Sequence, residues 1–121
     1  MKKPNWISCV DIASKYFNHF NNQDLKSLSE LYDEDIVLKD WLSEHNGKQA
    51  VLEAAERAFT TLKQIKIVVK NIYEIHDKGV ACEIDIHILD HEAAHLLRVV
   101  DVLDINDKAK ITEIRAYILN P

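Results

Sequence analysis

The sequence lacks the features that define several protein classes. Its 121 residues include only two glycines, two prolines and two cysteines. So few glycines and prolines leave little room for long irregular loops, and two cysteines cannot form a disulfide scaffold or a four-cysteine zinc site. No apolar run approaches the roughly 20 residues of a membrane-spanning helix. Lys2 and Lys3 could begin a signal peptide, but Asn5, Asp11 and Lys15 interrupt the apolar stretch that must follow, so none is expected.

Positive charge is also scarce. Fifteen lysines and arginines face twenty acidic residues, for a net charge of −5, and no basic cluster is present. This balance argues against nucleic acid as a partner, because phosphates need a basic face. The 47% apolar content is ordinary for a globular domain, and the length suits one domain spanning residues 1–121. Cys9 and Cys82 are expected to be buried thiols of a cytoplasmic protein, and no metal, cofactor or membrane partner is predicted.

The first half of the chain has the periodicity of helices. Between Trp6 and Phe20, apolar residues recur at intervals of three and four, which predicts one helix. A short second helix is predicted through Leu25–Tyr32, with either Asn22 or Asp24 as its N-cap. After an Asn-Gly turn, a third apolar stripe predicts a helix that ends at residue 62.

From Ile65 onward the period changes to two, which predicts strands. Helices followed by an antiparallel meander make an α+β domain, in which three N-terminal helices pack against one face of a curved antiparallel sheet and can enclose a pocket. The predicted strands cover residues 36–41, 65–75, 80–88, 96–105 and 110–119.

Asp101 is a polar residue on an apolar strand face. It alternates in step with Val99 and Leu103, which favours an inward carboxyl. The alternative places that face outside and Val100 and Val102 inside. An inward carboxyl without a nearby cation would have its pKa raised by desolvation.

Two further polar residues lie beside the expected pocket. Asp40 ends the first predicted strand, where a carboxylate suits proton transfer; the alternative is a solvated aspartate that caps a turn. Tyr16 lies on the first helical stripe, where a tyrosine is usually a core residue whose hydroxyl finds some partner.

Together these residues form a recognisable pattern. Tyr16, Asp24, Tyr32 and Asp40 follow one another at equal steps of eight, and the stretch 99–117 reads as a final hairpin. The pattern resembles the ketosteroid isomerase branch of the nuclear-transport-factor-2-like, or SnoaL-like, superfamily over essentially the whole chain.

The resemblance implies a cone-shaped α+β barrel of cystatin-like topology with a pocket at one end. It also implies roles: Asp40 as the base that takes a proton beside a carbonyl, with Tyr16 and Asp101 as hydrogen-bond donors to the resulting oxyanion. The expected ligand is a small apolar molecule and the expected chemistry needs no cofactor. The alternative is a ligand-binding or dimerisation module without catalysis.

The sequence departs from the isomerase pattern at three positions. The isomerases support the helix-one tyrosine with two others; Tyr32 matches one, but Ala55 stands at the second position. Trp41 follows the base in place of proline, and Ile118 replaces an aromatic residue. The expected pocket wall is mostly aliphatic, and nothing in it selects a steroid: Tyr32, Trp41, Ala55, Phe59, Cys82, Ile84, Ile86, Ile88, Leu97, Val99, Ile114, Ala116 and Ile118.

Two further segments contain weaker signals of function. His91-Glu92-Ala93-Ala94-His95 matches the zinc-protease motif, but its flanks are strand-like, so we expect a hairpin turn. Glu44 and His45 follow Asp40 and could lie at the pocket mouth, although such loop residues are usually solvated.

The outer sheet face predicts a homodimer. It is expected to carry four apolar residues that a single-domain monomer has no reason to expose: Val68, Ile72, Val100 and Val102.

Overall fold

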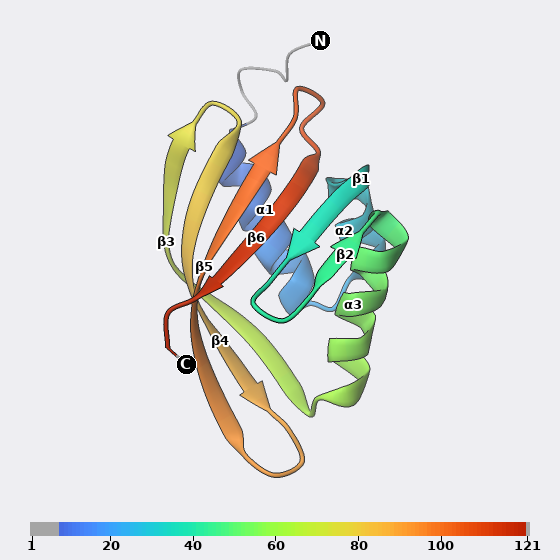
Figure 1. Cartoon of the computed structure of the whole chain (residues 1–121), viewed down its shortest axis with the longest axis vertical. Helices are drawn as coiled ribbons and strands as arrows, with labels where there is room; N and C mark the ends of the chain where they lie inside the picture. Colours follow the sequence, from blue (N-terminus) through green and yellow to red (C-terminus); the bar gives the residue numbers. More distant parts are fainter. Residues whose placement is uncertain (1–7, 121) are drawn as a thin grey trace.

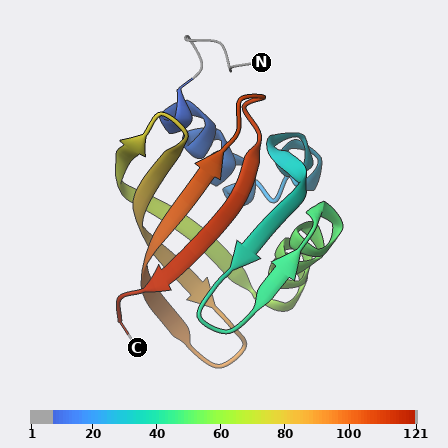
Figure 2. The same cartoon turned by 45° about the horizontal axis from the view of Figure 1, so that its top comes forward.

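The computed structural model describes residues 8–120. Three helices lie on one side of a curved sheet of six strands (Figures 1 and 2), as the α+β prediction requires. Trp6, Lys2 and Lys3 lie outside the described residues. The elements are α1 (Cys9–Asn21), α2 (Leu25–Leu31), β1 (Tyr32–Lys39), β2 (Glu44–Asn46), α3 (Lys48–Thr61), β3 (Gln64–His76), β4 (Gly79–Leu89), β5 (Ala94–Ile105) and β6 (Ile111–Ile118).

The helices begin at residues suited to capping. The Ser8 side chain accepts a hydrogen bond from the backbone N–H of Asp11 at 3.0 Å. Asp24, and not the alternative Asn22, caps α2. Gly47 precedes α3 with φ of 93°, a conformation that favours glycine. No helix within residues 8–120 is both long enough and apolar enough to span a membrane.

The sheet is mixed and open, which corrects the antiparallel barrel expected from the sequence. Its strand order is β2-β1-β6-β5-β4-β3, and β1 runs parallel to β6. The chain leaves β1 and β2 through α3, so the meander β3–β6 starts at the far edge and its last strand arrives beside β1 in the same direction. The short β2 was not predicted, because its three polar residues carry no apolar period.

A bulge in β3 decides which residues face the helices. Val69 pairs with Ile84, and Ile72 pairs with Cys82. Between these two pairs, β3 contains one residue more than β4. The extra residue shifts the alternation. Ile72 therefore packs against the core, and its assignment to the outer face was wrong.

The core fills the space between α1 and the concave face of the sheet. Phe17, Leu28, Ile36 and Leu103 are among its fully buried members. The predicted burial of both cysteines is confirmed, and no disulfide joins them.

Helix α1 is also fastened to the edge of the sheet. The Asn21 side chain donates to the backbone carbonyl of Ile67 and accepts from its N–H, both at 2.8 Å. Ile67 lies on β3, an edge strand. One amide thus satisfies both backbone groups of an edge residue and fixes the end of α1.

Candidate functional site

A cavity of about 430 Å³ lies between α1, α3 and the concave face of the sheet. Its wall combines apolar side chains with polar groups from separate elements. The polar or charged members are Tyr16, Tyr32, Asp40, Ser43, His45, Arg57 and Asp101, and the others are Phe20, Leu38, Trp41, Val51, Ala54, Ala55, Ala58, Ile67, Ile86, Ile114 and Ala116.

Asp101, Tyr16 and Tyr32 form the floor of the cavity, by which we mean its buried polar end. Asp101 is 5% exposed, so its inward orientation is the one observed, and Tyr16 and Tyr32 are equally buried. The two tyrosine rings lie 6.3 Å apart between centroids. None of the three side chains has a hydrogen-bond partner among residues 8–120. No fully enclosed side-chain oxygen or nitrogen among the described residues lacks a partner, so the polar atoms of these three residues are open to the cavity that they line.

Burial favours the neutral forms of the floor groups, and Asp101 stays mostly protonated below about pH 7. Burial raises the pKa of Asp101 to about 7. Burial, followed by the neighbouring Tyr32 and Asp101, raises the pKa of Tyr16 well above its ordinary value. Tyr32 shifts in the same direction, from burial and then Asp101, and burial raises the pKa of the adjacent Cys82 to about 12. A protonated carboxyl and two phenols are hydrogen-bond donors, the equipment that stabilises a developing oxyanion.

We call Asp40, Ser43 and His45 the rim of the cavity, because these lining residues are more exposed than those of the floor. Asp40 follows the last residue of β1, and its Oδ1 accepts from the N–H of Leu42 at 2.8 Å and from that of Ser43 at 2.7 Å. The aspartate therefore caps a turn, as the non-catalytic alternative predicted, and it also lines the cavity. The hydroxyl of Ser43 lies 3.2 Å from Asp40 Oδ1 and 3.1 Å from His45 Nε2.

The structure places the remaining predicted residues unevenly. Of the predicted wall, Tyr32, Trp41, Ala55, Ile86, Ile114 and Ala116 line the cavity. The others do not, because they pack in the core or lie beside other surfaces: Phe59, Cys82, Ile84, Ile88, Leu97, Val99 and Ile118. Phe59, for example, contacts Phe20 edge-on with ring centroids 4.9 Å apart. His45 reaches the cavity and Glu44 does not; the Glu44 carboxylate instead accepts from the Asn46 amide.

Sequence reasoning found only part of the contribution of α3, because Ala55 was predicted to line the pocket and its neighbours on the same stripe were not. Val51, Ala54, Ala55 and Ala58 lie at helical spacing and line the cavity. Because three of them are alanines, the helix leaves space beside the sheet. The spacing was visible in the sequence, but small residues on a stripe do not reveal whether a neighbour fills the space. Ser43 and Arg57 carried no signal.

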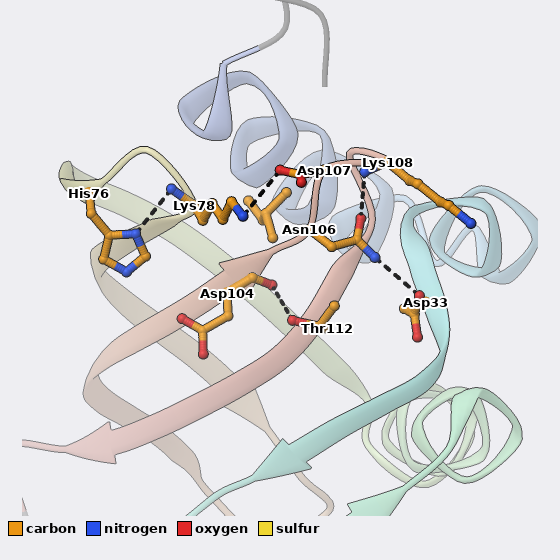
Figure 3. A pocket seen from close by; sticks show the side chains of 9 residues that line it. Asp33, His76, Lys78, Asp104, Asn106, Asp107, Lys108 and Thr112 are labelled. Carbon is orange, nitrogen blue, oxygen red and sulfur yellow. Dashed lines mark hydrogen bonds and ion pairs between the residues drawn. The ribbon is translucent and has the colours of Figure 1, made fainter. Parts of the chain in front are cut away.

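A second, larger cavity of about 630 Å³ opens among the turns at the other end of the sheet (Figure 3). Apart from Lys108, its charged side chains are already engaged: Lys78 forms an ion pair with Asp107 at 3.3 Å, the Asn106 amide donates to Asp33 at 3.2 Å, and Asp104 pairs with Arg115 at 2.6 Å. Its polar lining residues are exposed or half-buried, unlike Asp101, Tyr16 and Tyr32 in the first cavity.

The zinc-protease motif lies in a hairpin, as predicted. His91 is in the turn between β4 and β5, and His95 lies on β5. His95 Nε2 is 2.9 Å from Asp90 Oδ2. The two histidines are therefore not on one helix face, which the protease chemistry requires.

The fold and the cavity define a class, an α+β cone of the NTF2-like type, and comparison with known proteins identifies the family. A family model, the SnoaL-like domain, matches residues 13–114. The chain belongs to the SnoaL-like domain family. No curated protein matches the sequence significantly.

Solved structures share the fold at low sequence identity. An NTF2-like protein of unknown function from Cytophaga hutchinsonii is 17% identical, with a TM-score of 0.78 over 98% of this chain and 95% of that one. A putative SnoaL-like polyketide cyclase from Shewanella denitrificans is 14% identical, with a TM-score of 0.80 over 91% and 89%. A protein with a ketosteroid isomerase-like fold from Catenulispora acidiphila, in complex with trimethylamine, is 12% identical, with a TM-score of 0.80 over 92% and 86%.

Proposed function

We propose that the protein is a cofactor-independent enzyme that isomerises a small hydrophobic carbonyl compound by proton transfer. Asp40 at the rim takes a proton from the carbon beside the carbonyl. The electron pair of that C–H bond moves toward the carbonyl oxygen, and Tyr16 and Asp101 at the floor donate hydrogen bonds to it. Where the substrate has a β,γ carbon–carbon double bond, this gives a dienolate; Asp40 then returns the proton to the γ carbon, the C=O re-forms, and the double bond moves into conjugation with it.

The main support for this proposal is the set of polar groups at the floor of the cavity. A carboxyl and two hydroxyls on nearly buried residues have no hydrogen-bond partner among residues 8–120, and their polar atoms are open to the cavity, so they are free to bond a ligand there. A ligand oxygen between Tyr16 and Asp101 supplies the missing partner. The aliphatic and aromatic side chains between floor and rim suit an apolar body on that ligand.

Phenols and exchangeable ketones test this mechanism. A phenolate resembles an enolate, so a phenol series should bind with its oxygen at the floor. Asp40→Asn should bind phenols at least as tightly as the parent, because a neutral amide fits the rim. It should also lose about 10²- to 10⁴-fold in the rate at which the protein exchanges the α-protons of small cyclic ketones for deuterium, measured by NMR. Asp90→Asn, in the other hairpin, is the matched control and should change neither quantity.

A binding module without catalysis is the second candidate. Its support is that Asp40 caps its own turn, and that the Catenulispora acidiphila relative of the same fold holds a small molecule, trimethylamine. Tight phenol binding without any ketone exchange in the parent would decide for the module. Exchange that survives in Asp40→Asn would exclude Asp40 as the base.

We also propose that two copies of the chain pair through the convex face of the sheet. Val68 is exposed there, and Val100 and Val102 are half-buried. Tyr73 and Tyr117, each about half exposed, extend the same face. Light scattering at tens of micromolar, roughly where a standard interface holds, should give the mass of a dimer. A charge introduced by Tyr117→Asp should shift it toward monomer, and a parent that runs as a monomer would refute the pairing.

The cytoplasmic location expected from the buried thiols stays a prediction.

A further inference from the structure

The β1–β2 hairpin that carries Asp40 closes by a specific set of contacts. The Asp40 N–H donates to the carbonyl of Ser43 at 3.0 Å, and Asp40 Oδ1 accepts from the N–H groups of Leu42 and Ser43. Two residues before the aspartate, Leu38 pairs with His45, five residues after it. The histidine is thus held on the strand opposite the aspartate.

The β4–β5 hairpin repeats this arrangement position by position. The Asp90 N–H donates to the carbonyl of Ala93 at 3.1 Å, and Asp90 Oδ1 accepts from the N–H groups of Glu92 and Ala93 at 2.7 and 2.8 Å. Two residues before the aspartate, Ile88 pairs with His95, five residues after it. The two hairpins are therefore internal copies of one backbone design, and the second lies outside the candidate site.

The copies differ at the third residue after the aspartate. In the β4–β5 hairpin this is Ala93, and the histidine bonds the carboxylate directly, with His95 Nε2 2.9 Å from Asp90 Oδ2. In the β1–β2 hairpin it is Ser43, whose hydroxyl stands between the two side chains. His45 Nε2 bonds Ser43 Oγ at 3.1 Å, with no bond to the carboxylate.

The consequence falls on the second carboxylate oxygen. In the β4–β5 hairpin, Asp90 Oδ2 is occupied by the histidine. In the β1–β2 hairpin, the only hydrogen-bond contact of Asp40 Oδ2 among residues 8–120 is with Ser43 Oγ, at a long 3.4 Å. The hydroxyl has one proton, and at 3.2 Å it lies closer to Oδ1. Asp40 Oδ2 is thus left available beside the cavity.

We propose that Ser43 is a positioning residue that holds His45 away from Asp40 and so keeps Asp40 Oδ2 open to the ligand. The inference rests on the proposed function, because an open oxygen matters only if Asp40 moves a proton. Oδ2 is then the atom that accepts the proton from the substrate carbon, while Oδ1 keeps the turn closed. Without the hydroxyl, the β1–β2 hairpin becomes chemically like the β4–β5 hairpin, and the histidine takes Oδ2.

A reciprocal exchange between the hairpins tests the proposal. A crystal structure of Ser43→Ala should show His45 Nε2 about 3 Å from Asp40 Oδ2, and one of Ala93→Ser should show His95 bonded to the new hydroxyl and separated from Asp90. Ser43→Thr keeps the hydroxyl and should keep the parent arrangement. If His45 stays away from Asp40 in Ser43→Ala, the positioning role is refuted, whatever the activity.

The kinetic arm separates this role from simple support of the loop. Ser43→Ala should slow α-proton exchange of a cyclic ketone at least about tenfold, with phenol affinity unchanged, because the base and not the floor is blocked. Adding His45→Ala to Ser43→Ala should restore exchange toward the parent rate, since no histidine remains to take Oδ2. A loop that had merely lost its shape would not recover, and such a result would overturn the proposal. If the parent exchanges no ketone, the proposed function fails, while the crystal structures still decide where His45 lies.

Discussion

The floor and the rim of the cavity differ in how the hydrogen-bonding groups of their side chains are paired. At the floor, Asp101, Tyr16 and Tyr32 are almost completely buried and have no hydrogen-bond partner among residues 8–120. At the rim, Asp40, Ser43 and His45 are at least partly exposed and bond to one another or to nearby backbone. The floor therefore has hydrogen-bonding groups that the described part of the chain leaves unpaired, whereas the rim pairs most of its own.

The contrast also assigns opposite electrostatic behaviour. The floor resists charge, because burial penalises the ionised form of every group in it. At the rim, two backbone N–H groups and the Ser43 hydroxyl lie within hydrogen-bond distance of the Asp40 side chain. Under the proposed function, the rim takes the proton and the floor donates hydrogen bonds to the ligand oxygen on which negative charge develops.

The largest expected effect is on stability, from Asp101→Asn. Below about pH 4 the carboxyl is protonated in the folded and the unfolded chain. As the pH rises to about 7, the unfolded chain ionises while burial keeps Asp101 protonated, so the free energy of unfolding falls across this range and then stays low. The variant should therefore be more stable than the parent at pH 8, by on the order of 3 kcal/mol.

Urea unfolding at pH 3.5 and pH 8 measures this difference. The two proteins should unfold alike at pH 3.5, which serves as the internal control. Equal stability at pH 8 would mean that Asp101 ionises in the folded protein without a free-energy cost. Burial would then not raise its pKa.

A smaller effect is expected from Tyr16→Phe. The ring and its packing remain, but a phenol oxygen loses one donor, so phenol affinity should fall by about 1–3 kcal/mol. The free energy of unfolding should hold or rise slightly, because the lost hydroxyl had no protein partner. Calorimetric titration gives the affinity, and Tyr73→Phe, on the convex face, is the matched control. Unchanged affinity in Tyr16→Phe would place the ligand oxygen elsewhere.

The smallest effect is expected at the rim, from Trp41→Ala. Trp41 is 40% exposed, so its removal should change the free energy of unfolding by less than about 0.5 kcal/mol. Phenol affinity should fall only a few-fold, because the side chain covers the ligand without bonding its oxygen. A loss as large as that of Tyr16→Phe would show that rim and floor contribute alike, and the comparison would no longer hold.

Much of the fold followed from local patterns. The change of period near Ile65 located the boundary between helices and meander, and α2 ends, at Leu31, within a residue of its predicted end. The parallel pairing of β1 with β6 could not be predicted in the same way, because it joins strands far apart in the sequence. The orientation of Ile72 was missed for a related reason: a bulge shifts the alternation, and no residue in the sequence announces it.

In the candidate site too, local features could be predicted from the sequence and non-local ones could not. The alternation around Asp101 predicted its burial, because period and face are local properties. The extent of the cavity was not local. Whether Ile84 or Ile86 touches the space depends on where α1 packs across the sheet, and only Ile86 does. The function of Ser43 was invisible, because its meaning comes from comparison with Ala93 in another hairpin.

The two hydrogen bonds between the Asn21 side chain and the Ile67 backbone affect whether another strand can add to the sheet. An edge strand presents N–H and carbonyl groups on which another extended chain can build, and this is how sheets recruit further strands and grow into fibres. β3 is such an edge, and the side chain of Asn21 already occupies both backbone groups of Ile67. An incoming strand would have to displace a paired amide at this residue, so the side chain that anchors a helix also blocks strand addition at Ile67.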